Sequence, residues 1–389
     1  MVGLQLRKME QMNQHRIRVL HVHGDLIAGG GQVLSREWLA SIDRSRFEPF
    51  VVVLNQPTTL KSSFEDNEIR VTEIFGNRIA QIIKLAKYIR KNKIDIVHTQ
   101  SEPDRKVGHW AALITRRPVV AHAHSAWVYF AGENQANVIK QLRSSIMLKA
   151  RKISERSVVA FIATSQVVAD SFSQLTSKPI TVVEPGVSIR NAVYSADEKL
   201  QAKNKMGLEK NQRLIVNASR LDDLKNLDDF ILAIAKMRAE VDVVGFIYGE
   251  GEDKTDLEQL IENVGCKEFI KILEPVTDLV PVFGAADIFL ATSLSESFGM
   301  SVLESLSQGL PVVAYDLEAY ERYGDGICRV SLNDVDALVS QSIKILNSSN
   351  YANEIVEKGI QACKDFDITV GTKKLEAIYS KNTQKISNK

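Results

Sequence analysis

Short apolar runs alternate with helix-like segments along the first half of the chain. The apolar runs cover residues 18–23, 49–55, 69–74, 95–100, 118–124, 158–164 and 180–185. Several are almost entirely apolar, which is typical of strands buried on both faces. Amphipathic patterns lie between them at residues 79–92, 102–115 and 138–157. The alternation predicts a parallel sheet with helices on both faces.

The same pattern starts again after a polar stretch at residues 188–211. Further strand-like runs cover residues 214–219, 241–248, 269–273, 287–293 and 311–316, with helical patterns at 227–239, 254–264 and 299–308. Only helical segments follow residue 334. We therefore expect two doubly wound, Rossmann-like α/β domains facing across a cleft. Ligands would bind at the carboxyl ends of their strands.

The expected domain boundaries follow from this pattern. Residues 1–187 form an N-terminal domain, 188–211 a linker, 212–366 a second domain, and 367–389 a C-terminal helix and tail. A chain of 389 residues is long enough for two cores.

Charge is distributed unevenly between the two halves. Residues 1–190 carry 27 Lys and Arg against 16 Asp and Glu, whereas the remainder carries 22 against 32. The split suggests domains with different partners, although drift in surface composition is the alternative. No apolar run reaches the roughly 18 residues of a membrane span, and the N-terminus lacks the apolar stretch of a secretion signal. We expect a cytoplasmic protein whose cysteines, Cys266, Cys328 and Cys363, are small buried hydrophobes.

Two glutamates near the last strands carry the clearest chemistry. Glu296 follows the predicted strand at 287–293, and Glu304 lies one turn into the next helix. Gly299 between them allows backbone N–H groups at a helix start to approach an anion. Carboxylates there can accept hydrogen bonds from the hydroxyls of a ribose or a hexose. Taken alone, the pair is equally compatible with two solvated surface acids.

Other segments narrow the interpretation. They are the glycine loop Ala28-Gly29-Gly30-Gly31-Gln32, the basic pair in SRLDDLKNLDDFILAI, the segment GEGEDKTDLEQL and the strand GLPVVAY. With the two glutamates, these segments make the chain similar to the retaining GT-B glycosyltransferases of family four, the glycogen-synthase-like group. The chain resembles most closely the bacterial enzymes that build exopolysaccharide and capsule.

The resemblance implies roles for particular residues. Arg220 and Lys225 would contact the donor diphosphate and stabilise the leaving nucleotide, Glu304 would hold the ribose, and Glu296 the transferred sugar. The residues expected to bind the donor are Gly29, Gly30, Gly31, Arg220, Lys225, Glu296, Ser297, Phe298, Gly299 and Glu304. The residues expected to act in catalysis are His124, Glu296, Arg220 and Lys225. A plain tight turn is the alternative for the three glycines.

Histidines form two pairs with strand spacing. His122 and His124 lie two residues apart, so their side chains share one face of a strand. The resemblance implies that His124 lines the site near the sugar and the departing phosphate. A buried structural role is the alternative for both and is favoured for His122. His21 and His23 have the same spacing, and we expect them to be structural.

Several other classes are disfavoured by the sequence. The glycine loop lacks the third glycine of a dinucleotide fingerprint, which argues against an NAD enzyme. No Gly-x4-Gly-Lys-Ser/Thr segment occurs, which argues against a P-loop protein. No cluster of metal ligands is patterned, so no metal cofactor is expected. Asp-x-Asp pairs at Asp334/Asp336 and Asp365/Asp367 lie among helical segments, where we expect helix caps.

One basic amphipathic stretch, residues 139–157, suggests a further partner. Its six Lys and Arg side chains would attract anionic lipid headgroups, and an ordinary helix with a charged outer face is the alternative. Aromatic residues are not interleaved with the basic ones, so nucleic-acid binding is not expected.

The sequence thus predicts a cytoplasmic, metal-independent glycosyltransferase that uses a nucleotide-sugar donor, which we expect to be UDP-linked. The acceptor would be a glycan or a lipid-linked glycan, and the protein would touch the inner face of the membrane. Two alternatives stay open: a sugar-nucleotide epimerase of the same architecture, and a catalytically silent partner subunit. Nucleotide release from a panel of sugar donors would separate the three.

Overall fold

A computed structural model describes residues 16–27, 29–100, 102–124, 152–173, 176–189 and 194–387. The chain divides into two compact units. Unit 1 comprises Met1–Glu184 and Ile368–Lys389, and unit 2 comprises Pro185–Asp367. Each unit is built on one parallel sheet, as the sequence predicts.

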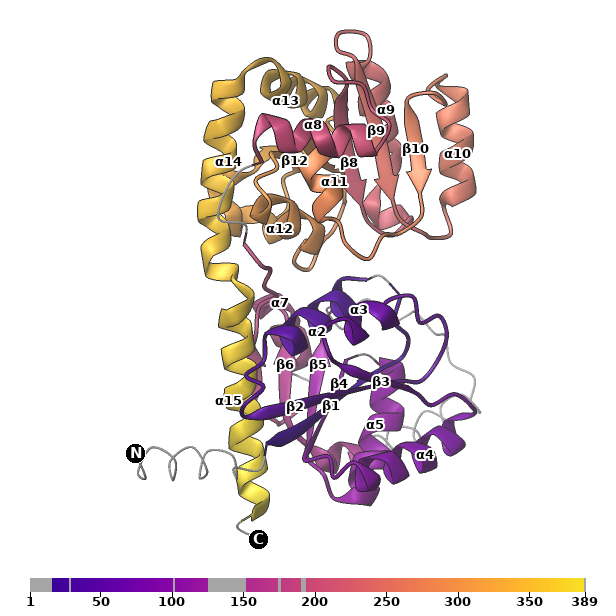
Figure 1. Cartoon of the computed structure of the whole chain (residues 1–389), viewed down its shortest axis with the longest axis vertical. Coiled ribbons are helices and arrows are strands. Elements are labelled where there is room, and N and C mark those ends of the chain that lie inside the picture. The colour runs from indigo at the N-terminus through magenta and orange to yellow at the C-terminus, as the bar shows by residue number, and fades with distance from the viewer. Residues whose placement is uncertain are drawn as a thin grey trace. The chain divides into compact units, whose positions relative to one another are not determined.

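Within the described residues, unit 1 has a seven-stranded parallel sheet in the order β3-β2-β1-β4-β5-β6-β7. Figure 1 labels β1 to β6 of this sheet. The strands are β1 (Ile17–His23), β2 (Phe47–Val53), β3 (Arg70–Glu73), β4 (Ile96–Thr99), β5 (Val119–Ala123), β6 (Val158–Ala163) and β7 (Ile180–Val182). Each lies within or beside a predicted run. All five residues of β5 are buried, because helices cover both faces of the sheet.

The helices of unit 1 divide between the two faces of its sheet. They are α2 (Gly30–Ser41), α3 (Lys61–Glu65), α4 (Arg78–Lys91), α5 (Glu102–Thr115), α7 (Gln166–Ser173) and α15 (Ile368–Ser387), with a short 3-10 helix at Glu155–Ser157. Side chains of α4 and α5 pack on one face with Leu20 and Val97. On the other face, Trp38 of α2 and Tyr379 of α15 pack together with Val19. Each such buried large apolar side chain contributes roughly 1.5–3 kcal/mol.

Within the described residues, unit 2 has a six-stranded parallel sheet in the order β10-β9-β8-β11-β12-β13. The strands are β8 (Arg213–Ala218), β9 (Val243–Tyr248), β10 (Ile270–Leu273), β11 (Ile288–Ala291), β12 (Val312–Tyr315) and β13 (Cys328–Val330). The helices are α8 (Ala196–Lys205), α9 (Leu227–Met237), α10 (Lys254–Asn263), α11 (Val280–Ala285), α12 (Met300–Ser307), α13 (Val335–Asn347) and α14 (Ser349–Cys363). Three 3-10 helices cover Asp223–Lys225, Glu318–Gly326 and Lys364–Phe366.

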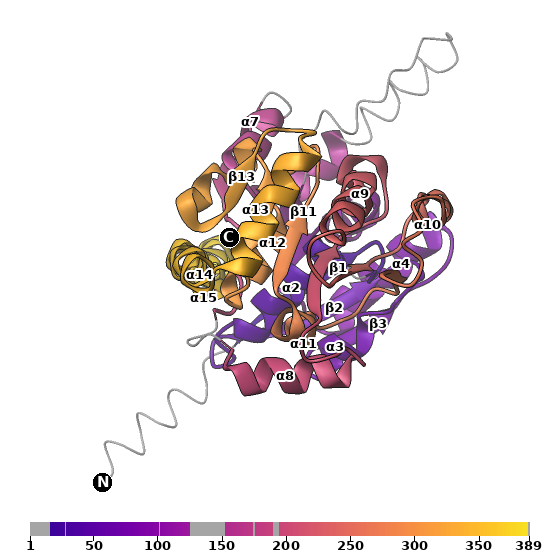
Figure 2. The ribbon, with the colours of Figure 1, turned by 90° about the horizontal axis from the view of Figure 1, so that it is seen from above.

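The two faces of this sheet bury separate apolar clusters. Side chains of α9, α10 and α13 pack on one face, and side chains of α8, α11 and α12 on the other. Figure 2 shows α9 and α13 from above. The N-cap of α13 is Asp334, whose carboxylate accepts a hydrogen bond from the N–H of Ala337 at 2.9 Å, so the predicted cap is confirmed at this residue. The three cysteines are buried and free, as expected.

The division into units differs from the expected boundaries in two places. The stretch expected to be a linker, residues 188–211, belongs to unit 2 and contains α8. A capping box between Ser195 and Glu198 begins this helix, and its Lys203 forms a buried ion pair with Asp287 at 2.7 Å. The C-terminal helix α15 belongs to unit 1, because its buried face packs against α2 and the first sheet.

Candidate active site

The order of the second sheet determines where the loops of unit 2 meet. Strands β8 and β11 are neighbours, and the chain runs outward from them in opposite directions along the sheet. In open α/β sheets, ligands bind beside the carboxyl ends of the strands at such a reversal. The loops that follow β8 and β11 contain Arg220, Lys225 and Glu296, three of the predicted site residues.

Lys225 and Glu296 form an ion pair at this reversal. The Lys225 Nζ lies 2.5 Å from Glu296 Oε1, and each side chain is 15% exposed. The Ser293 hydroxyl donates to the same carboxylate oxygen at 3.0 Å. The Thr292 hydroxyl donates to the Lys225 carbonyl oxygen at 2.9 Å and joins the two loops. A cation and a carboxylate, both expected to contact the donor, are thus held side by side.

Arg220 occupies a different environment. Its side chain is 69% exposed and forms an ion pair with Asp222 at 2.8 Å. Among the described residues, no ion pair joins Arg220 to Glu296. The structure therefore brings Lys225 and Glu296 together but leaves Arg220 at the surface of the same loop. A guanidinium in this position is free to reorient toward an anion at little cost in packing.

Gly299 allows the loop after Glu296 to enter α12. It adopts a left-handed conformation with φ of 79°, which other residues rarely adopt. A Cβ atom there would lie 2.6 Å from Cε1 of Tyr320, so a side chain does not fit. The first N–H groups of α12 follow at once, and such groups favour bound anions. Gly299 therefore shapes the predicted anion-binding end of this helix.

The remaining predicted residues of unit 2 surround this helix start. Phe298 is buried and packs edge-on against Phe366, with ring centroids 5.6 Å apart. Ser297 and Glu304 are half-buried, and Glu304 lies in the second turn of α12. Burial and the Glu296 carboxylate raise the pKa of Tyr320, which keeps its hydroxyl protonated beneath the loop.

In unit 1 the predicted glycine loop follows β1, which lies at the corresponding reversal beside β4, and His124 directly follows β5, the next strand of the sheet. Gly29 is the N-cap of α2, and Gly30 and Gly31 form its first turn. A Cβ atom on Gly31 would lie 3.3 Å from Cε1 of the His124 ring, which is tight for a carbon contact. Residue 31 is therefore best occupied by glycine, because the His124 ring packs against its backbone. None of the three glycines has a positive φ.

His124, which is half-buried, contacts a cluster of buried histidines on one face of the first sheet. Its ring lies 3.9 Å from that of His122, as the shared strand face predicts. Burial, together with the charge on Arg105, lowers the pKa of His124 to about 3. Burial likewise lowers the pKa values of His21, His23 and His122, so all four rings are neutral near pH 7. His21 and His23 are buried and hydrogen-bonded to Ser35, in agreement with a structural role.

Two family models together match most of the chain. "Glycosyltransferase Family 4" matches residues 28–191, and "Glycosyl transferases group 1" matches residues 198–362. The chain is a GT-B glycosyltransferase of this type.

Individual relatives agree with this assignment. The glycosyltransferase is 24% identical over 313 residues to the UDP-Gal:alpha-D-GlcNAc-diphosphoundecaprenol alpha-1,3-galactosyltransferase of Escherichia coli. This match covers 77% of this chain and 78% of that protein. It is 22% identical to the N-acetyl-alpha-D-glucosaminyl L-malate synthase of Bacillus anthracis over 72% of each chain. The structure of Anabaena HepE in complex with UDP-glucose matches with a TM-score of 0.78 and 20% identity, over 94% of this chain and all of that one.

Sequence reasoning missed some residues that shape the site of the glycosyltransferase. A Cβ atom on Gly249 would lie 1.9 Å from the Ser219 carbonyl oxygen, and one on Gly251 would lie 2.1 Å from that of Leu221. The loop after β9 thus lies directly against the loop that carries Arg220. The segment GEGEDK contributed to the resemblance, but its spacing alone did not indicate this contact.

Other predictions for the glycosyltransferase stay open. Of the basic stretch at residues 139–157, residues 139–151 lie outside the described residues. Within the described ranges, no three His, Cys, Asp or Glu side chains are grouped as metal ligands, and metal independence stays a prediction. None of the helices in those ranges has the length and apolar character needed to cross a bilayer.

Proposed function

We propose that this glycosyltransferase transfers a hexose from a UDP-linked sugar, with retention of the anomeric configuration, to a glycan or lipid-linked glycan. The observation that carries the proposal is the Lys225–Glu296 pair beside Gly299 at the start of α12. It combines a cation for a phosphate, a carboxylate for sugar hydroxyls, and helix N–H groups for an anion.

In this proposal unit 2 holds the donor. Lys225 and Arg220 neutralise the diphosphate as the glycosidic bond breaks, so that no metal is required. Glu304 accepts hydrogen bonds from the ribose. Glu296 and the backbone of residues 297–299 hold the sugar and the distal phosphate. The UDP-glucose complex of Anabaena HepE supports the choice of a UDP-linked donor.

Unit 1 contributes His124 and the glycine loop in this proposal. The backbone of Gly29, Gly30 and Gly31 approaches the distal phosphate, and His124 bonds a sugar hydroxyl beside the reacting carbon. Retention follows from attack on the same face that the leaving phosphate departs from, with that phosphate taking the acceptor proton. The acceptor oxygen forms the new bond to the anomeric carbon, and the nucleotide diphosphate leaves with the electron pair.

The acceptor proposal rests on what the relatives are named for. The Escherichia coli relative acts on a diphosphoundecaprenol-linked sugar, and a relative from Acholeplasma laidlawii, 21% identical over 331 residues, is an alpha-monoglucosyldiacylglycerol synthase. These names support a lipid-linked acceptor. The proposed role in exopolysaccharide, capsule or related surface glycan synthesis rests on the sequence resemblance alone. The reaction would then take place at the cytoplasmic face of the membrane.

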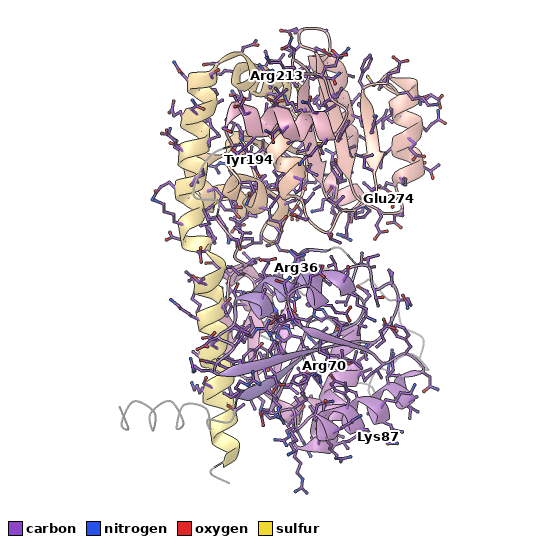
Figure 3. The ribbon with its side chains drawn as sticks, viewed as in Figure 1. Arg36, Arg70, Lys87, Tyr194, Arg213 and Glu274 are labelled. Atoms are coloured by element: carbon purple, nitrogen blue, oxygen red, sulfur yellow. The ribbon has the colours of Figure 1, made fainter. Side chains whose placement is uncertain are left out.

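Basic surface residues of unit 1 support peripheral membrane binding. On α4, the exposed side chains are Arg78, Ile79, Ile83, Lys84, Lys87, Arg90 and Lys91 (Figure 3 labels Lys87). Helices that combine exposed apolar and basic residues bind anionic lipid surfaces. Lys152 and Arg156, from the described end of the 139–157 stretch, are also exposed.

Nucleotide release from a panel of sugar donors tests the proposal. With a lipid-linked glycan acceptor, we expect UDP release from one UDP-hexose, a product of retained configuration, and unchanged turnover in EDTA. An epimerase would convert the donor without an acceptor, and a silent subunit would release nothing. Turnover that EDTA abolishes and Mg²⁺ restores would contradict metal independence, and release only from donors with another nucleotide would contradict the UDP assignment.

A further inference from the structure

A buried glutamine lies between the histidines of unit 1. Gln100 follows β4 directly and is 4% exposed. Its Oε1 lies 2.9 Å from His124 Nε2 and 3.2 Å from His122 Nδ1, while its Nε2 lies 3.0 Å from His21 Nδ1. Its backbone N–H donates to the Asp104 carboxylate at 2.5 Å. Both ends of the amide are therefore bonded to imidazole rings.

With the Gln100 amide oriented as in the structure, one set of proton positions satisfies the hydrogen-bond chain behind it. His21 Nδ1 accepts from the Gln100 amide and, at 2.8 Å, from the Ser35 hydroxyl. His21 Nε2 then carries a proton and donates to the Tyr379 hydroxyl at 2.8 Å, which in turn donates to His98 Nδ1 at 2.5 Å. Each donor in this chain faces an acceptor when the rings are neutral.

In this set of proton positions the amide also fixes the tautomer of His124. Because Gln100 presents its oxygen to His124 Nε2 in this orientation, that nitrogen carries the proton. Nδ1 then holds the lone pair, and it has no hydrogen-bond partner among the described residues. Rotation of the ring is further restricted by Gly31, whose backbone lies against it.

We propose that Gln100 is a positioning residue that fixes His124 as the Nε2-protonated tautomer, so that Nδ1 accepts a hydrogen bond from a hydroxyl of the substrate sugar. The low pKa of His124 supports a neutral ring in this role. The hydrogen bond from the sugar hydroxyl rests on the proposed function, whereas the tautomer of His124 does not depend on it. In this role His124 selects for a hydroxyl donor and cannot protonate a leaving phosphate.

The tautomer can be measured without turnover. In full-length protein labelled with ¹⁵N-histidine, the signals of His124 are identified by their loss in His124→Asn. We expect a protonated Nε2 and an unprotonated Nδ1 at pH 7.5 in the wild type, and exchange between tautomers in Gln100→Leu. Gln81→Leu is the matched control, because Gln81 is 5% exposed, lies on the opposite face of the sheet and donates to the Leu54 carbonyl oxygen. It should leave the His124 signals unchanged.

Kinetics then test the connection to the substrate. If Gln100 acts through His124, Gln100→Leu lowers kcat by roughly 10- to 100-fold with little change in the KM for the donor. The double variant Gln100→Leu/His124→Asn should be no slower than His124→Asn alone. A double variant whose loss of kcat equals the product of the losses in the two single variants would overturn the positioning role.

The two readouts separate failure of the inference from failure of the proposed function. A wild-type His124 that is protonated on Nδ1, or that exchanges between tautomers, overturns the inference whatever the protein catalyses. The expected spectra without any glycosyl transfer would leave the tautomer standing and overturn the proposed function.

Discussion

Lys225 and Arg220 have the same proposed role but different surroundings, so removing each side chain should have different effects. Both Lys225→Ala and Arg220→Ala should lower kcat/KM by roughly 10²- to 10³-fold, because each removes a positive charge that stabilises the leaving diphosphate. Only Lys225→Ala should also lower the free energy of unfolding, by about 1–3 kcal/mol, since Glu296 is 15% exposed and loses its partner. Steady-state kinetics and urea unfolding measure the two effects.

Lys236→Ala is the matched control for this comparison. It removes a lysine of the same unit whose side chain is 51% exposed and paired with Asp336. Such exposed pairs contribute about 0–1 kcal/mol, so stability and kinetics should stay near wild type. Wild-type kinetics in both site variants would contradict the assignment of the donor site.

Gly299 should tolerate no side chain, for two separable reasons. Gly299→Ala places a Cβ at a φ of 79° and 2.6 Å from the Tyr320 ring. Gly207 has a similar φ of 71° but no atom within 4 Å of its Cβ position. We expect Gly207→Ala to cost about 1–2 kcal/mol from backbone strain alone. Gly299→Ala should add roughly 1–3 kcal/mol from overpacking. Equal unfolding free energies for the two variants would contradict the packing argument.

Single residues differ in how much their sequence context reveals. Gly299 stands between a strand and a helix, so its position was predictable from the local pattern. The ion pair between Lys225 and Glu296 was not, because 71 positions separate them and only the order β8-β11 brings them together. Gln100 was missed for a similar reason: nothing in its neighbourhood along the chain indicates that three histidine rings surround it.

At the scale of elements, the histidines of β1, β4 and β5 make the stability of unit 1 depend on pH. Burial lowers the pKa values of His21, His23, His98 and His122 below the ordinary value, so the unfolded chain binds more protons below about pH 6.5. The free energy of unfolding therefore falls as the pH falls through this range. At pH 5, each ring that the folded protein keeps neutral lowers the free energy of unfolding by roughly 2 kcal/mol.

Fluorescence can assign this loss to unit 1. All three tryptophans, at positions 38, 110 and 127, belong to unit 1, and so do all seven histidines. Urea midpoints from tryptophan fluorescence should fall steeply between pH 7 and pH 5, and His23→Asn should reduce the slope. A midpoint that is unchanged over this range would contradict neutral, buried rings in the folded protein.

Most elements were predictable because their apolar patterns are long. The five longest strands of unit 1 and unit 2 lie where the apolar runs predict them, whereas β13 is only three residues long and was missed. Helix α8 was assigned to a linker, because its exposed surface is polar and its few buried contacts give a weak pattern. The place of α15 in unit 1 depends on contacts such as that of Tyr379 with His21, which no local pattern reveals.

At the scale of the whole molecule, the charge difference between the two halves predicts which part binds a membrane. The variant Lys87→Glu/Lys91→Glu reverses two exposed charges of α4, and each basic residue near an anionic bilayer contributes about 1 kcal/mol. We expect wild-type protein to sediment with anionic vesicles at low salt and much less at high salt. The variant should sediment weakly under both conditions.

Two controls accompany the vesicle experiment. Lys267→Glu/Lys364→Glu reverses two exposed charges of unit 2 and should bind vesicles like the wild type. Lys149→Glu/Arg151→Glu/Lys152→Glu tests the stretch first predicted from the sequence. Wild-type protein that ignores anionic vesicles at low salt would contradict membrane binding, and the acceptor would then be a soluble glycan.

Calorimetric titration of UDP tests the central claim most directly, because the claim is that unit 2 holds a UDP-linked donor through Lys225 and Glu296. We predict one UDP site in the wild type. Lys225→Ala should bind UDP at least about tenfold more weakly, since one fixed charge is lost. Two control variants should bind UDP like the wild type. Lys236→Ala alters an exposed ion pair elsewhere in unit 2, and Gln100→Leu alters unit 1. No UDP binding to the wild type, or equal binding to Lys225→Ala, would contradict the account.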